Sequence, residues 1–126
     1  MQVLLIITVA VHVLSAVFWA GSTFVLARNG GQGATNLLGS QVGAASLLIL
    51  SGLLLGYLLH RGSFELTEKI LATGAAAAIL AFLIQVIVVR SALRSTDGAQ
   101  RLAIGYRASA ILLAVAVICM AVSRYA

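Results

Sequence analysis

The residues best suited to chemistry form a stripe on the first apolar stretch of the chain. Its members recur at steps of three or four residues: Thr8, His12, Ser15, Trp19 and Ser22. At about 100° per residue they fall within roughly 80° of one helical face. His12 is the ionisable member of the stripe, and a neutral imidazole is a ligand for haem iron or copper. Ser15 and Trp19 would then flank the bound cofactor.

The same pattern has a structural interpretation. A polar stripe on a helix that crosses a bilayer should face other helices rather than lipid. His12 could then be a neutral packing residue, hydrogen-bonded to Thr8, to Ser15 or to a facing helix. Both interpretations stay open at the level of sequence.

A metal needs more ligands than one imidazole, and the other candidates are His60, Cys119, Met120 and Met1. Imidazole and soft sulfur donors suit Cu(I). His12 should lie about 15 Å from the start of its helix, near the bilayer centre. Cys119 and Met120 should lie within one or two turns of the surface, and His60 at the surface. These depths do not match, so a second imidazole for haem b would come from His12 of a twofold partner.

The composition predicts an integral membrane protein. Hydrophobic residues make up 62 % of the 126 residues and charged residues 9 %, against roughly 45–50 % and about 25 % in soluble domains. The net charge of +5 arises from cations at the ends of apolar runs, where they meet lipid headgroups. No basic helix or aromatic stacking platform supports binding to nucleic acid.

Four apolar runs define the expected fold. Each is near the ~20 residues needed to span a bilayer, and they cover about 2–27, 37–59, 66–89 and 102–123. Short connections predict an all-α, antiparallel four-helix bundle with up-down-up-down topology, in a single domain over 1–126. Apart from Glu68 in the first turn of the third run, no acidic residue lies inside a run. Paired-carboxylate catalysis therefore has no basis, and a non-enzymatic role is favoured over an enzyme.

Small residues predict how the second run packs. It carries Gly39-x-x-x-Gly43 and, on a roughly opposite face, Gly52-x-x-x-Gly56. Such pairs let helix backbones approach closely in lipid. We therefore expect this helix to contact neighbours on both sides.

A second polar group gathers toward the other end of the bundle, at Gln41, Gln85, Tyr106 and Arg107. Buried amides in lipid usually bond across helices, and the Arg107 side chain can extend to the headgroups. This interpretation is favoured over a pocket for a quinone or a lipid headgroup.

The loop cations predict an orientation. Arg28, Arg90, Arg94 and Arg101 share one side, whereas the other side holds Arg61, Lys69 and Arg124. Cytoplasmic loops carry the excess of Lys and Arg. Both termini are then expected in the periplasm of a bacterial inner membrane.

Two short segments carry a family resemblance. The stretch from Val11-His12 through Trp19-Ala-Gly21, together with Met120-Ala-Val-Ser-Arg124-Tyr125, resembles the copper-resistance D-like (CopD-like) family of small membrane proteins. The resemblance implies a link to copper or haem, with His12 as the matching position. The His and Trp-x-Gly pattern is also similar to that of the HemJ-type protoporphyrinogen oxidases, which implies an enzyme of porphyrin oxidation.

The leading functional hypothesis is a membrane protein associated with copper or haem b, with His12 as ligand. The alternative is an accessory structural subunit of a larger respiratory or photosynthetic complex, in which His12 is a structural hydrogen-bonder. Expected partners are the lipid bilayer and either other membrane subunits or a second copy of the chain.

Overall fold

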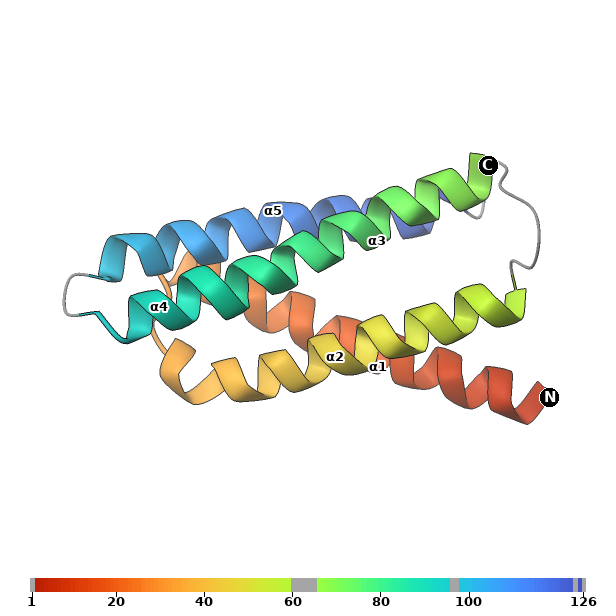
Figure 1. Ribbon diagram of the computed structural model, residues 1–126, viewed down its shortest axis with the longest axis horizontal. Coiled ribbons are helices and arrows are strands. Elements are labelled where there is room, and N and C mark those ends of the chain that lie inside the picture. Colours follow the sequence, from red (N-terminus) through yellow and green to blue (C-terminus); the bar gives the residue numbers. More distant parts are fainter. Residues whose placement is uncertain (1, 60–65, 96–97, 124, 126) are drawn as a thin grey trace.

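The computed structural model describes residues 2–59, 66–95, 98–123 and 125, and these residues are almost entirely helical (Figure 1). The elements are α1 (Gln2–Arg28), α2 (Ala34–Leu59), α3 (Leu66–Ile84), the π-helical turn η1 (Gln85–Val89), α4 (Arg90–Leu93) and α5 (Ala99–Ser123). α3, η1 and α4 follow one another without a break, so the described residues make four long helices, each apolar enough to cross a membrane. The four predicted runs are confirmed as helices, although α2 and α5 begin earlier than residues 37 and 102.

The connection between α1 and α2 is a glycine turn. Gly30, Gly31 and Gly33 have φ angles of 68°, 87° and 95°, which residues with a Cβ rarely adopt. The Gly31 amide donates to the Leu26 carbonyl at 2.7 Å, so the end of α1 is capped by the turn itself. The chain can therefore reverse direction within a few residues.

The helices associate as two pairs. α1 packs along α2, the α3–η1–α4 helix packs along α5, and contacts between α1 and α5 join the pairs. α2 and α3 touch only slightly. Figure 1 shows the pairs converging at the end that holds α4 and diverging toward the end where the N-terminus lies. We call these the closed end and the splayed end.

The core between the pairs consists largely of small side chains. Ala45, Ala77, Ala78, Ala81 and Ala116 are buried there. Small residues allow helix backbones to approach closely, which is the main source of helix association in lipid. A Cβ added at Gly74 would lie 3.0 Å from Cys119 Cβ and 3.3 Å from the Ala116 carbonyl oxygen. α3 and α5 thus approach so closely at this point that even an alanine would require a small shift of one helix.

The expected two-sided packing of α2 is wrong for one glycine pair. Gly39 and Gly43 are exposed, and a Cβ added at either would have nothing within 4 Å. Gly52 is in close contact, since its added Cβ would lie 3.1 Å from Cε1 of His12. The reason is that α2 packs on α1 and diverges from α3, so one of its faces has no helical neighbour among the residues that the structure describes.

Candidate functional site

The polar stripe of α1 faces the interior, as its spacing predicts. Thr8, Ser15 and Trp19 are buried, and His12 and Ser22 are half-buried. The stripe also continues through Thr23, which is fully buried. Its residues contribute to two different regions of the bundle, one at the closed end and one at the splayed end.

At the closed end the stripe joins a buried hydrogen-bond network. The Trp19 indole N–H donates to Oε1 of Gln85 at 2.8 Å, and Nε2 of Gln85 donates to the Thr23 hydroxyl at 2.9 Å. Both Trp19 and Gln85 are almost completely buried. The network therefore links α1 to η1 in a region where an unpaired polar group would be costly.

Gln41 extends this network to α2 and α5. Its Nε2 donates to the Ser22 hydroxyl at 2.9 Å and reaches the Thr23 hydroxyl at 3.4 Å. Its Oε1 accepts from the Tyr106 hydroxyl at 2.7 Å. The prediction that Gln41 and Gln85 bond across helices is confirmed, whereas Arg107 is exposed.

The π-helical turn explains how Gln85 reaches the network. Ala81, Gln85 and Val89 are all buried, although steps of four residues drift by about 40° on a regular α-helix. The wider turn of η1 corrects this drift, because a π-helical turn takes more than 3.6 residues. No buried side-chain nitrogen or oxygen of the described residues lacks a hydrogen-bond partner. The network thus holds α1, α2, η1 and α5 together, and its buried atoms offer no free donor or acceptor to a ligand.

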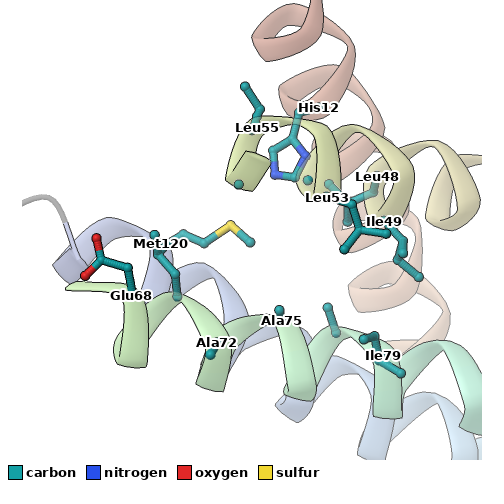
Figure 2. Close-up of a pocket in the computed structure, with 14 residues that line it drawn as sticks. His12, Leu48, Ile49, Leu53, Leu55, Glu68, Ala72, Ala75, Ile79 and Met120 are labelled. Carbon is teal, nitrogen blue, oxygen red and sulfur yellow. The ribbon is translucent and has the colours of Figure 1, made fainter. Parts of the chain in front are cut away.

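The splayed end contains a cavity of about 470 Å³ that is partly open to the surface (Figure 2). Its walls come mainly from α2 and α3, with His12 from α1 and Met120 from α5. Apart from His12, Glu68 and Met120, the described lining residues are Leu, Ile, Ala and Gly. An apolar pocket of 300–1,000 Å³ with a few polar groups is typical of ligand sites.

Ser51 orients the imidazole of His12. The Ser51 hydroxyl donates to the Leu48 carbonyl at 3.1 Å and lies 3.0 Å from Nδ1 of His12. When the Ser51 hydroxyl donates to Leu48, its oxygen can accept the Nδ1–H of the imidazole, which is the tautomer with Nε2 unprotonated. Nε2 then carries the free lone pair, and a ring oriented in this way is typical of a metal-binding histidine.

Met120 lies across the cavity from His12. Figure 2 shows the two side chains extending toward each other from opposite walls, with one ring nitrogen on the side of the Met120 sulfur. The expectation that their depths differ too much is therefore wrong. α1 is tilted, and its first turns project beyond the end of α5 (Figure 1), so counting residues from the helix ends misplaces His12 relative to Met120.

The other predicted ligands are not brought to this cavity. Cys119 is half-buried, with its Cβ close to Gly74 of α3, and it does not line the cavity. Ser15 and Trp19 do not line it either, and the Trp19 indole is bonded to Gln85. His60 and Met1 lie outside the described residues. Within the described parts of the chain, no group of three or more His, Cys, Asp and Glu residues could hold a metal ion.

The sequence pattern did not single out Ser51 as a partner of His12. The available signal was its position beside Gly52, since a helix surface with a glycine leaves room for a ring from a neighbouring helix. Comparisons of the chain with protein-family models, with curated proteins and with solved structures find no match. Functional inference therefore starts from the cavity and its two facing donors.

Gly52 provides a test of this local arrangement. Gly52→Leu should displace the imidazole and lower the midpoint of thermal unfolding in detergent, because even a Cβ would contact His12 at 3.1 Å and overpacking costs about 1–3 kcal/mol. Gly43→Leu is the matched control, since that position is open, and it should leave the midpoint unchanged. Equal midpoints for both variants would contradict the placement of His12 against α2.

Proposed function

We propose that this chain is an integral membrane protein that binds haem b in the cavity at its splayed end, with Nε2 of His12 as a ligand of the iron. The observation that carries the proposal is the His12 imidazole, fixed by Ser51 and facing an otherwise apolar cavity. An ionisable residue placed within a membrane-spanning helix is usually functional. In the tautomer protonated at Nδ1, Nε2 offers its lone pair to a ligand in the cavity.

The surface of the protein supports insertion as an antiparallel bundle. Large apolar side chains such as Leu14, Leu53, Ile87 and Ile111 are more than 60 % exposed, and they come from all four long helices. A monomeric protein in water rarely exposes apolar surfaces of this extent, whereas a protein surface that faces lipid is apolar. Insertion also explains why the buried polar network is fully paired.

The cavity suits haem better than a bare copper ion. A planar macrocycle needs apolar walls and one or two axial donors, and this cavity offers hydrocarbon walls with an imidazole and a thioether. A copper ion held by protein alone usually has more than two ligands, as in His₂Cys sites with an axial Met. The described residues offer no cluster of that kind.

Haem supplies one-electron chemistry when it is bound, and the chain supplies binding and orientation. Ser51 would hold the imidazole, and the aliphatic side chains of α2 and α3 would line the faces of the ring. The lining residues that the structure describes contain no paired carboxylates for acid–base work, with Glu68 as their acidic member. We therefore propose electron transfer or haem carriage rather than catalysis on an organic substrate.

Titration with ferric haem tests the proposal. The full chain in detergent should give a shifted Soret band that saturates at one haem per chain. If the haem spectrum stays that of free haem, the proposal is wrong. If the protein instead binds Cu(I), and does so through His12, the site is a copper site of unusual coordination.

The cations support an orientation with both termini in the periplasm. Arg28, Arg90, Arg94 and Arg101 are exposed near the closed end, and Lys69 is exposed near the splayed end; Arg61 and Arg124 lie outside the described residues. The larger group marks the closed end as cytoplasmic. We expect a reporter fused after Ala126 to be active only outside the cytoplasm of a bacterial host. Cytoplasmic activity would reverse the orientation.

A role as an accessory subunit remains a second candidate, favoured by the open face of α2. Gly39, Ser40 and Gly43 are exposed there, and such a surface would allow a helix of another subunit to approach closely. A chain that binds neither haem nor copper, and that copurifies with one larger membrane complex, would favour this candidate over haem binding.

A further inference from the structure

We propose that Met120 is the second axial ligand of the iron, so that one chain supplies both the imidazole and the thioether. The inference deepens the proposed function and depends on it. Met120 and His12 come from α5 and α1, line the same cavity, and extend toward each other (Figure 2). A planar ring held between them would lie within the cavity of a single protomer.

The chemistry of the two donors fits a haem iron buried in an apolar pocket. Imidazole and thioether are both neutral, so the two ligands themselves would add no charge to the cavity. His and Met are an established axial pair for haem iron, and the methionine raises the reduction potential relative to imidazole. A haem held by this pair would therefore be stabilised in its ferrous state relative to a bis-imidazole haem.

The two ligands differ in rigidity. His12 is fixed by Ser51 at 3.0 Å and by close contact with Gly52, whereas a methionine side chain has three rotatable bonds and adapts its position. The flexible ligand comes from the opposite helix pair, across the opening between α2 and α3. The chain would thus offer the iron one fixed ligand, His12, and one adaptable ligand, Met120.

A ligand from the same chain changes the expected stoichiometry. In a bis-imidazole site the second His12 would come from a partner chain, and two chains would share one haem. In the structure, His12 is directed toward α2 and the cavity of its own bundle. The His12–Met120 pair gives one haem per chain and needs no dimer.

Spectra of Met120→Leu test the inference. Leucine fills a similar volume, so the fold should persist. The haem-loaded full-length variant should lose the far-red charge-transfer band of methionine-ligated ferric haem, change from low spin to high spin, and bind carbon monoxide readily when reduced. Cys119→Ala is the matched control, because Cys119 is the adjacent sulfur residue but does not line the cavity. It should keep the wild-type spectrum.

Met120→His provides a second readout. It should restore a low-spin spectrum without the charge-transfer band, and it should lower the reduction potential relative to the wild type. The inference is overturned if haem binds through His12 but Met120→Leu keeps the low-spin spectrum and the charge-transfer band. If wild-type protein binds no haem, the proposed function itself fails, which is a different outcome from a Met120 variant that leaves the spectrum unchanged.

Discussion

Gln41→Leu is expected to destabilise the bundle more than any other single replacement of a polar side chain. Gln41 is fully buried and bonds to Ser22, Thr23 and Tyr106. Leucine would leave the Tyr106 hydroxyl without its acceptor in an apolar interior. Hydrogen bonds between membrane helices contribute about 0.6 kcal/mol on average, and an unsatisfied buried group costs about 1–3 kcal/mol. We expect a total loss of about 2–4 kcal/mol.

Thermal unfolding in detergent, followed by circular dichroism, measures this loss. Gln100→Leu is the matched control, because it makes the same replacement at an exposed position in the first turn of α5. The control should unfold at the wild-type midpoint, and Gln41→Leu several degrees lower. If the two variants unfold together, the network contributes no net stability to the closed end.

Hydropathy and spacing predicted much of this architecture. Four apolar runs predict four long helices because a helix satisfies its own backbone hydrogen bonds, as a segment that crosses a bilayer must. The inward direction of Thr8, Ser15 and Trp19 follows from their shared helical face. The bonding of Gln41 and Gln85 across helices follows from the cost of an unpaired amide in an apolar interior.

The cavity could not be predicted, because it depends on how the helices are tilted and offset. Residue counting gives a depth along one helix, but it does not show that the first turns of α1 project beyond α5. Met120 therefore seemed too far from His12. The π-helical turn at Gln85–Val89 could not be predicted either. Its residues show no pattern that distinguishes a π-helical turn from a regular α-helix.

The glycine pairs show the same limit. Gly39 and Gly52 belong to equivalent motifs. A Cβ added at Gly52 would lie 3.1 Å from Cε1 of His12, whereas a Cβ added at Gly39 would have no atom within 4 Å. A small-residue motif indicates that close approach is possible. Which motif is used depends on the direction in which α2 diverges from α3.

His12→Ala is expected to abolish haem binding. The iron would lose its fixed ligand, while the cavity walls from α2 and α3 would remain. Removal of an outer partner of a metal ligand typically costs 10–100-fold in affinity, so loss of the ligand itself should cost more than about 100-fold. Free imidazole added to the variant should occupy the space left by the side chain and partly restore the Soret band.

Two comparisons separate loss of a ligand from loss of the fold. Phe18→Ala removes a ring from the outer face of the same helix, where Phe18 is 42 % exposed, and it should bind haem like the wild type. The circular dichroism of His12→Ala should remain helical. An unfolded His12→Ala variant that imidazole does not rescue would assign His12 to packing against Ser51 rather than to haem.

The most direct measurement is the haem content of the full-length protein purified from membranes, determined as the pyridine haemochrome beside His12→Ala prepared in parallel. Haem binding through His12 predicts about one haem per chain in the wild type and essentially none in the variant. Equal haem content in the two proteins, or no haem in either, would contradict it.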